Sequence, residues 1–213
     1  MQGGSLVLLL LLLWTLVTTT HGAIKQQKPS IDFGLLENGI YRLKSCGIWP
    51  RCFDFAEHMG FTNKSCSGTR EPPVVLRDFS KSRRWKSWNV TFSNLEKSSV
   101  DATFQAFWPK DSKTRPKCDG GFVRDDTPSS SCKGEKESPL FLSQKEPERM
   151  FRIRAADDES GCVHVYDPKR ENAGCPSLFA AAKDCNGDLN VVLESKDDGS
   201  FRHRWQLVPE TGT

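Results

Sequence analysis

The sequence lacks a marked excess of either charge. It contains 30 Lys and Arg residues against 27 Asp and Glu residues, which gives a formal net charge of +3 at pH 7. A nucleic-acid-binding domain usually carries a strong basic excess, because contacts to the phosphate backbone supply much of its affinity. The near balance of charge therefore argues against a nucleic-acid partner.

The short motifs that mark enzymes and cofactor sites are also missing. Beyond residue 22 the histidines are His58, His164 and His203. No nucleophile elbow, zinc-protease motif or phosphate-binding loop accompanies them. No Cys-x-x-Cys pair suggests a zinc site, and the oxygen-rich segment 184–190 lacks the glycine and glutamate positions of a calcium loop. These absences predict a non-catalytic protein that needs neither a metal nor a cofactor.

Long apolar runs are scarce, and the one that is present stands at the N-terminus. Residues 6–17 are apolar except for Thr15, and small or polar residues follow as far as Gly22. This order is typical of a secretory signal peptide. An uncleaved anchor is the alternative, but a spanning helix needs about 20 apolar residues. We therefore expect residues 1–22 to be a signal peptide and the mature chain to be secreted, extracellular and without a membrane span.

Cysteine, in contrast, is plentiful. An even number of cysteines in an oxidising compartment predicts up to four disulfides and no free thiol. Local pairing is our expectation, with Cys118 bonded to Cys132 and Cys162 bonded to Cys185. The eight cysteines all follow the signal segment: Cys46, Cys52, Cys66, Cys118, Cys132, Cys162, Cys175 and Cys185.

Two acceptor sequences for N-linked glycans are present. They begin at Asn63, in Asn-Lys-Ser, and at Asn89, in Asn-Val-Thr. In a secreted chain such sequences predict surface positions that carry glycans. We therefore expect a glycoprotein modified at one or both asparagines.

Short runs of alternating apolar residues recur along the chain, whereas helical periodicity is rare. Each run is bounded by Gly, Pro, Asn, Asp or Ser, which is typical of an antiparallel sandwich or barrel. The runs are 40–43, 74–76, 88–92, 103–107, 140–142, 151–154, 162–166, 189–193 and 205–208.

Two turn sequences organise the C-terminal third. Asn186-Gly187 and Asp198-Gly199 tolerate the positive φ values that tight hairpins require. They separate residues 178–184, 189–195 and 201–208. The spacing predicts a three-stranded meander in this part of the chain.

A weak aromatic repeat lies over this strand pattern. Trp88, Phe151 and Trp205 each follow basic residues, and the best copy continues from strand 151–155 through Ser160-Gly161-Cys162 into strand 163–165. The chain closes with Arg-Trp-Gln-Leu-Val-Pro at residues 204–209. This pattern resembles the repeat of ricin-B-type β-trefoil lectins, most closely from Phe151 to Pro209.

The resemblance implies an all-β, antiparallel, disulfide-stapled barrel with three pseudo-repeats. It would form a single domain over residues 36–210, after an N-terminal extension at residues 23–35. That family places Gln two residues before the aromatic anchor, whereas this chain has Lys86, Arg149 and His203 at those places. The resemblance therefore supports the predicted fold more directly than it supports sugar binding.

A dense basic segment is the sharpest local signal for a ligand. It comprises Lys81, Arg83, Arg84, Trp85 and Lys86. Guanidinium groups bind sulfate or phosphate oxygens through paired donors, and the tryptophan could stack on a sugar. A solvated edge strand kept soluble by its charge is the alternative, as is proteolytic processing after Arg84. The segment is our candidate polyanion-binding site.

The tryptophans divide into two groups. Trp88 and Trp205 are expected to be core anchors, since they begin apolar strands of the repeat. Trp49 and Trp108 stand at strand ends, each followed by proline. They could form an exposed sugar platform or pack against the core, as large aromatic side chains usually do.

Taken together, the sequence favours a secreted non-catalytic binding protein. The expected partner is an extracellular glycan, either a carbohydrate or a sulfated polysaccharide. Two alternatives stay open: a structural component of an extracellular or mineral-associated matrix, and a secreted toxin or defence protein. The sequence leaves the oligomeric state undecided.

Overall fold

The computed structural model describes residues 31–46, 56–61, 72–78, 86–108, 120–125, 132, 135–146, 150–156, 161–181, 190–195 and 199–210. Within these ranges the chain forms a 13-stranded sheet with one short helix and two 3-10 turns. The strands are β1 (Gly39–Ser45), β2 (Ala56–Phe61), β3 (Val74–Asp78), β4 (Trp88–Ser93), β5 (Ser99–Ala106), β6 (Phe122–Arg124), β7 (Glu137–Pro139), β8 (Phe141–Ser143), β9 (Phe151–Ala155), β10 (Val163–Tyr166), β11 (Leu178–Ala181), β12 (Val191–Glu194) and β13 (Trp205–Pro209). The helix α2 spans Pro168–Asn172, and the turns η1 and η3 span Phe33–Leu35 and Phe201–His203.

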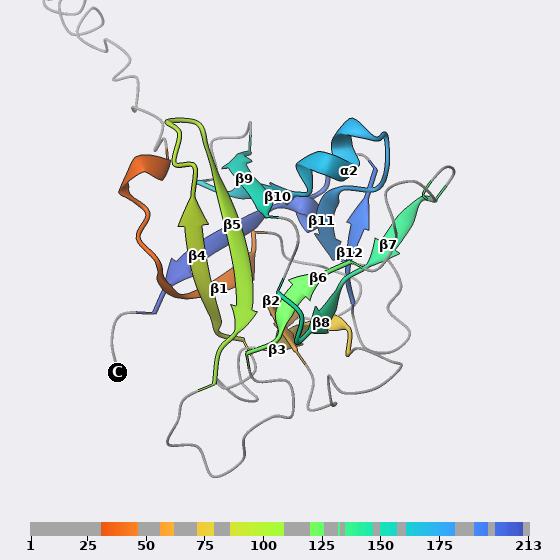
Figure 1. Cartoon of the computed structure of the whole chain (residues 1–213), viewed down its shortest axis with the longest axis horizontal. Coiled ribbons are helices and arrows are strands. Elements are labelled where there is room, and N and C mark those ends of the chain that lie inside the picture. The colour runs from red at the N-terminus through yellow and green to blue at the C-terminus, as the bar shows by residue number, and fades with distance from the viewer. Residues whose placement is uncertain are drawn as a thin grey trace, which may run out of the picture.

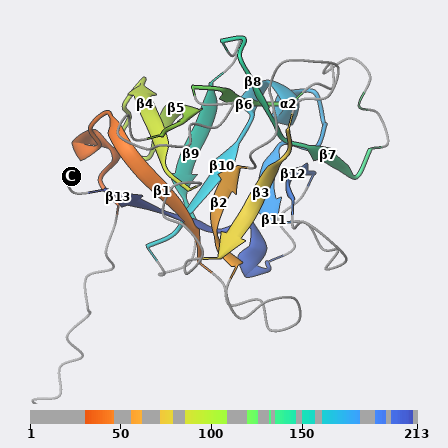
Figure 2. The ribbon, with the colours of Figure 1, turned by 90° about the horizontal axis from the view of Figure 1, so that it is seen from below.

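Six of the strands close into a barrel (Figure 1, Figure 2). Strand β1 pairs with β4, β4 with β5, β5 with β9, β9 with β10 and β10 with β13, and β13 returns to β1. Every one of these pairs is antiparallel. The ring has no open edge, because each of its strands has a partner on both sides.

Six of the other seven strands pair two by two in a threefold order, and the seventh, β7, pairs with β12. Strands β2 and β3 pair between β1 and β4, β6 and β8 pair between β5 and β9, and β11 and β12 pair between β10 and β13. We call β1–β4, β5–β9 and β10–β13 the first, second and third repeats. The arrangement confirms the predicted all-β antiparallel barrel with three pseudo-repeats.

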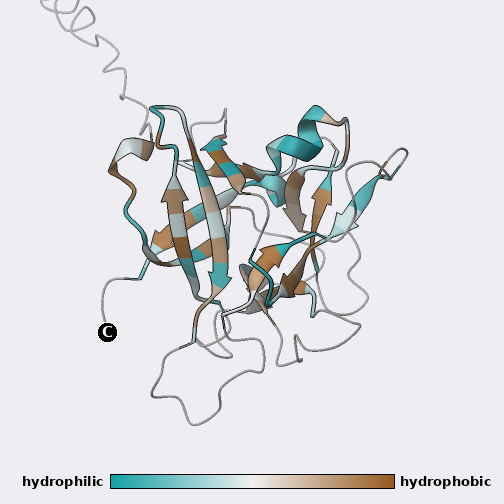
Figure 3. Ribbon diagram, in the orientation of Figure 1, coloured by the Kyte–Doolittle hydropathy of each residue, from teal (hydrophilic) through white to brown (hydrophobic). Residues whose placement is uncertain are grey.

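The interior of the barrel is built by simple alternation. In β4 the residues Trp88, Val90 and Phe92 are buried while Asn89 and Thr91 point outward. Successive side chains of a strand lie on opposite faces, so one face of each strand fills the core. Figure 3 shows the same alternation as brown, apolar stretches interleaved with teal or white ones along the strands. Each large apolar side chain so buried contributes about 1.5–3 kcal/mol.

The aromatic repeat of the sequence is a repeat of the structure. Trp88, Phe151 and Trp205 are the first residues of β4, β9 and β13, and all three are buried. The indole Nε1 of Trp88 donates to the Met59 carbonyl oxygen over 3.0 Å. That of Trp205 donates to the Phe179 carbonyl oxygen over 3.2 Å. The second repeat has no such bond at this position, because a phenylalanine ring carries no donor.

The disulfide expectation was wrong. Cys46 bonds Cys162, and Cys132 bonds Cys175. Both bonds join different repeats. For Cys46 and Cys162 the reason is that the ring brings the end of β1 and the start of β10 to either side of β13. Sequence proximity therefore does not decide the pairing. Cys118 and Cys185, the other partners that we expected, lie outside the described residues, as do Cys52 and Cys66.

The predicted C-terminal meander was also wrong in its last strand. Strands β11 and β12 pair as expected, but the second neighbour of β12 is β7, and β13 pairs with β1 and β10. Strand β13 is part of the barrel, because Trp205 anchors it in the core. Gly199, of the predicted Asp-Gly turn, has φ 76°, a left-handed conformation that favours glycine.

The segment before β1 packs onto the barrel. Phe33 of η1 is buried in the core, and Ile31 and Leu36 pack against it from the rim. Asp32 caps the turn by accepting a hydrogen bond from the Gly34 amide over 3.0 Å. In the described part of the chain, no helix has the length and apolar character needed to cross a membrane.

Candidate functional site

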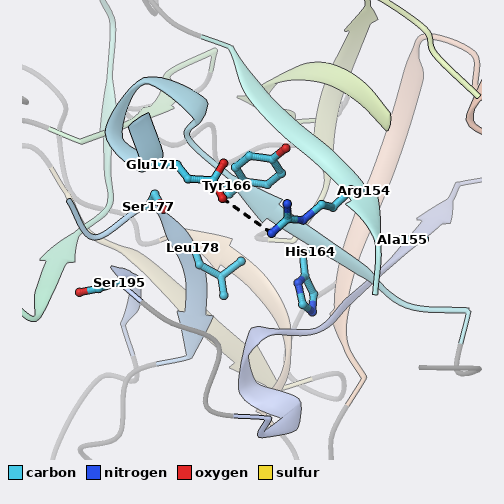
Figure 4. A pocket seen from close by; sticks show the side chains of 8 residues that line it. All are labelled: Arg154, Ala155, His164, Tyr166, Glu171, Ser177, Leu178 and Ser195. Atoms are coloured by element: carbon cyan, nitrogen blue, oxygen red, sulfur yellow. Dashed lines mark ion pairs between the residues drawn. The ribbon is translucent and has the colours of Figure 1, made fainter. Parts of the chain in front are cut away.

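A hollow of about 210 Å³ lies on the outside of the barrel, where the second and third repeats meet (Figure 4). Strands β9 and β10 form one wall, and α2, β11 and the end of β12 form the other. The polar side chains that line it are Arg154, His164, Tyr166, Glu171, Ser177 and Ser195.

Strand alternation places the first of these groups. In β9, Ile153 points into the core, so Arg154 points outward; in β10, Val165 points inward, so His164 points outward. His164 and Arg154 are direct partners in the antiparallel register. Their side chains therefore lie next to each other on the outer face, and His164 is largely covered there, being only 8% exposed.

Arg154 is held from two directions. Its guanidinium carbon lies 4.5 Å from the centre of the Tyr166 ring, within the range of a cation–π contact. Its Nη2 lies 3.8 Å from Oε1 of Glu171. Figure 4 shows the guanidinium reaching toward Glu171, beside the Tyr166 ring and close to the His164 ring. Because the Arg154 and Glu171 side chains are 47% and 44% exposed, both groups can be reached from solvent.

Helix α2 carries Glu171 to the hollow. Asp167 caps its N-terminus, with Oδ1 accepting from the amides of Lys169 over 2.8 Å and Arg170 over 3.2 Å. Pro168 occupies the first turn, where its missing N–H leaves no bond unmade. A cap and a proline together let a helix of only five residues form.

A buried arginine and a disulfide fix this helix to the second repeat. Arg170 is fully buried; its Nε donates to the Pro176 carbonyl oxygen over 2.6 Å and its Nη1 to Oδ1 of Asp125 over 2.9 Å. The Cys132–Cys175 bond ties down the loop that follows the helix. Breaking a buried ion pair is costly, because it leaves an uncompensated charge. These contacts therefore hold α2 in place, and Glu171 on this helix has a rigid support.

A second buried network lies beneath the other wall. Glu194, the register partner of Leu178, accepts hydrogen bonds from Arg202 and from Nε2 of His203, the latter over 2.9 Å. Arg202 also donates to the Ala181 carbonyl oxygen over 2.9 Å. Burial raises the pKa of Glu194, but the hydrogen bonds and positive charges of Arg202 and His203 outweigh it, so the pKa lies below its ordinary value. Glu194 is therefore a structural anion that fixes β12 to η3.

The hollow combines donors and acceptors that suit a hydroxylated ligand. A guanidinium donates only, a carboxylate accepts only, and serine hydroxyls do both. Adjacent hydroxyls of a sugar can accept from Arg154 while donating to Glu171. In the part of the chain that the structure describes, no group of three or more His, Cys, Asp or Glu side chains is arranged to hold a metal ion.

Comparison with known proteins concerns the fold. No model of a protein family matches the sequence, and no curated protein matches it. The crystal structure of the Rhizoctonia solani agglutinin is similar, with a TM-score of 0.54 at 12% identity over 82% of this chain and 97% of that one. The chain is a β-trefoil. A designed 3-fold symmetric protein, ThreeFoil, gives a TM-score of 0.49 at 11% identity over 81% of this chain and all of its own.

Most of the basic segment lies outside the described part of the β-trefoil. That holds for Lys81, Arg83, Arg84 and Trp85. Lys86 is described, and its side chain is only 2% exposed, so in this structure it does not contribute to a surface patch. The polyanion site of the other four residues stays a prediction.

The positive charge of Lys86 helps to lower the pKa of His58 inside the trefoil. The pKa of His58 falls to about 4, first because the imidazole is desolvated by burial and then because Lys86, Arg42 and Lys44 are positively charged. His58 is therefore neutral at pH 7. It lies on β2 opposite Lys44 and is not among the residues that line the hollow.

The other predicted positions are placed only in part. Trp88 and Trp205 are core anchors, as predicted, and Trp108 is 4% exposed, which favours packing over an open platform. Asn89 lies on β4 with its amide partly buried, 3.4 Å from Oε1 of Gln105. Asn63 and Trp49 lie outside the described residues. Glycosylation at the two sequons stays a prediction.

Sequence reasoning missed the residues that make the hollow. Arg154 and His164 alternate with core residues in the best copy of the repeat, so their outward direction was readable. The Asp-Pro pair at residues 167 and 168 is a helix-start signal that would have revealed α2. The approach of Glu171 to Arg154 has no sequence signal, because it depends on how the helix packs against β9.

Proposed function

We propose that this chain is a secreted, non-catalytic carbohydrate-binding protein, and that the hollow beside α2 receives a single sugar ring. The observation that carries the proposal is the exposed Arg154–Glu171 pair, in which the Arg154 guanidinium lies over the Tyr166 ring. A solved β-trefoil of similar fold is an agglutinin by name, which supports the same class of function.

The chemistry of the hollow supports a sugar over an apolar ligand. Sugars present neighbouring hydroxyls that donate and accept at once, and a guanidinium beside a carboxylate satisfies both roles. Charge-assisted hydrogen bonds of this kind are stronger than neutral ones. An apolar ligand would instead remove water from Arg154 and Glu171 without offering either side chain a hydrogen bond, which is costly.

The size of the hollow sets the expected affinity. Pockets for drug-sized ligands usually measure about 300–1,000 Å³, and this hollow is smaller, at about 210 Å³. It suits one monosaccharide ring held by a few polar contacts. A dissociation constant near 1 mM, or a binding free energy of about −4 kcal/mol, is the expected scale.

Secretion is supported by the covalent structure. Two disulfides join the repeats in the described residues, and such bonds persist in oxidising compartments. The signal segment at residues 1–22 and the sequons at Asn63 and Asn89 are consistent with this location.

The test is a titration of the folded, oxidised protein with galactose, mannose and N-acetylglucosamine, followed by amide NMR. We expect at least one of these sugars to shift amide signals around the hollow in the millimolar range. Arg154→Ala should weaken that binding about tenfold. Lys97→Ala, which removes an exposed cation from the β4–β5 turn, is the control and should change nothing. If none of the three sugars shifts any signal at tens of millimolar, the proposal fails.

The basic segment at residues 81–85 supports a wider ligand class, the sulfated polysaccharides. Its guanidinium groups could bind the sulfate groups along such a chain. Heparin chromatography tests this: Arg83→Ala with Arg84→Ala should elute at clearly lower salt than the unaltered protein. Lys97→Ala with Lys145→Ala removes the same charge elsewhere and should elute between the two. If both double variants eluted at the same salt concentration, net charge and not this segment would explain the binding to heparin.

A further inference from the structure

The three repeats of the barrel can be superposed residue by residue through their strand registers. Each aromatic anchor, on the last strand of its repeat, faces one residue of the first strand of the same repeat. The facing pairs are Tyr41 with Trp88, Ala102 with Phe151, and Val163 with Trp205. These pairs define equivalent positions in β1, β5 and β10 without any reference to sequence similarity.

The outward position that holds His164 and Arg154 therefore has two counterparts. It recurs one residue after each facing position, where the first strand of a repeat pairs with the last strand of the preceding repeat. The counterparts are Arg42 opposite Val208, between the third and first repeats, and Thr103 opposite Thr91, between the first and second. Two residues further along each first strand, the counterparts of Tyr166 are Lys44 and Gln105.

The three positions differ in chemistry. Arg154 is replaced by an aliphatic valine at one counterpart and by a short hydroxyl side chain at the other. Tyr166, which supports the guanidinium, is replaced by a lysine and by an amide. The combination of a guanidinium and an aromatic ring is thus found at one of these three equivalent positions, the one at β9 and β10.

The polar groups at the two counterparts already bond the protein itself. Nε of Arg42 lies 2.9 Å from Oε1 of Glu210, and the same carboxylate oxygen accepts from the Ser87 hydroxyl over 2.8 Å. Nε2 of Gln105 donates to the Gly120 carbonyl oxygen over 2.9 Å, and its Oε1 accepts from Asn89. Binding a sugar there would require these internal bonds to break.

We infer that, of these three equivalent positions, the one at β9–β10 alone binds a sugar ring, with Arg154 as the residue that determines it, so that the three positions together bind one sugar ring per chain. The inference rests on the proposed function and adds to it a valency and a location. Of the three equivalent positions of the barrel, one is thus functional. The Tyr166 ring orients Arg154 and is a positioning residue.

The first experiment locates the site and counts it. The probe is whichever of galactose, mannose and N-acetylglucosamine gives the largest amide shifts with the full oxidised chain. We expect shifts at the amides of Arg154, His164 and Glu171, and none at Arg42 or Thr103. The binding curve should fit one sugar per chain.

The second experiment exchanges chemistry between repeats. Arg154→Thr gives the site the side chain of its counterpart in β4, and should weaken the probe sugar about tenfold. Thr91→Val is the matched control, because it changes an exposed residue of that counterpart at constant volume, and affinity should not move. Adding Tyr166→Gln to Arg154→Thr should abolish binding, and unchanged near-ultraviolet circular dichroism must accompany each variant.

The outcomes separate the inference from the function beneath it. Shifts at Arg42 or Thr103, or two to three sugars per chain, would overturn the single-site inference while leaving carbohydrate binding intact. Full affinity in the folded Arg154→Thr variant would overturn the role of Arg154. No response to any of the three sugars would overturn the proposed function, and the valency with it.

Discussion

At the scale of single residues, burial decides what an ion pair is worth in this protein. Arg170 and Arg154 each face a carboxylate, but Arg170 is fully buried against Asp125 while Arg154 is nearly half exposed beside Glu171. An exposed pair contributes about 0–1 kcal/mol, whereas breaking a buried pair leaves an uncompensated charge and costs about 3–5 kcal/mol.

The two arginines therefore make a matched pair of substitutions. Arg170→Ala should lower the free energy of unfolding by about 3–5 kcal/mol, and Arg154→Ala by less than about 1 kcal/mol. Urea denaturation at pH 7 measures both. Equal losses would contradict the assignment of Arg170 as the support of α2.

Two residues give the stability a dependence on pH in separate windows. The folded-state pKa of His58 is about 4 against 6.5 for the free side chain, so the unfolded chain binds a proton more readily. The stability that His58 contributes is present above about pH 6.5 and is lost as the pH falls toward 4, by up to about 3 kcal/mol. His58→Gln should flatten the decline in this window, as urea midpoints at pH 7 and pH 4.5 would reveal.

Glu194 acts at lower pH. Its folded-state pKa lies below the ordinary 4.5, so its contribution is complete above that pH and is lost as the pH falls further. Glu194→Gln should lower the free energy of unfolding at neutral pH, and that free energy should then fall less steeply in acid.

The His58 prediction has its own contradicting outcome. If His58→Gln changed the free energy of unfolding only below pH 4, the burial of that imidazole would be misassigned.

At the scale of elements, alternation made most of the barrel readable. Strands β1, β4, β9, β10 and β13 each keep apolar residues on one face, and the sequence predicts all of them. Strand β7 has no such pattern, because its residues Glu137–Pro139 form a strand only by pairing with β12. Helix α2 is too short for helical periodicity. Its existence depends on the Asp167 cap and on the anchoring of Arg170.

The candidate site, like the barrel, could be predicted from the sequence only in part. The outward direction of Arg154 and His164 follows from alternation along β9 and β10. The position of Glu171 could not be read, since it depends on the packing of α2 and on a disulfide whose partners are 43 residues apart. Periodicity reports local order, and this site is completed by contacts between repeats.

The anchor of the third repeat can be tested by one substitution. Trp205→Phe gives the third repeat the residue type that the second repeat has at Phe151. It removes the bond from Nε1 to the Phe179 carbonyl oxygen and part of the ring volume, so the free energy of unfolding should fall by about 2–3 kcal/mol. Urea denaturation measures the loss. No loss at all would mean that the indole bond does not stabilise the repeat.

At the scale of the whole molecule, the two disulfides do different things. Cys46–Cys162 closes a loop of 116 residues and Cys132–Cys175 one of 43. Constraint of the unfolded chain predicts about 4–5 kcal/mol for each, slightly more for the longer loop. Paired Cys→Ala variants and urea denaturation would measure these values.

Only one of the two bonds should affect sugar affinity. Cys132→Ala with Cys175→Ala loosens the loop behind α2, and should weaken binding at the hollow several-fold. Cys46→Ala with Cys162→Ala removes the other bond and serves as the control, with affinity retained where the variant is folded. Equal affinity in both variants would show that Glu171 does not need this support.

The longer bond also changes what a protease could do to the molecule. Arg84 falls between Cys46 and Cys162 in the sequence, so a cut after it would not release a fragment. It would convert one polypeptide into a two-chain protein held by a sulfur bridge, with the barrel strands β1 and β10 still linked. Such a nicked form would migrate as a single band on a non-reducing gel and as two bands after reduction.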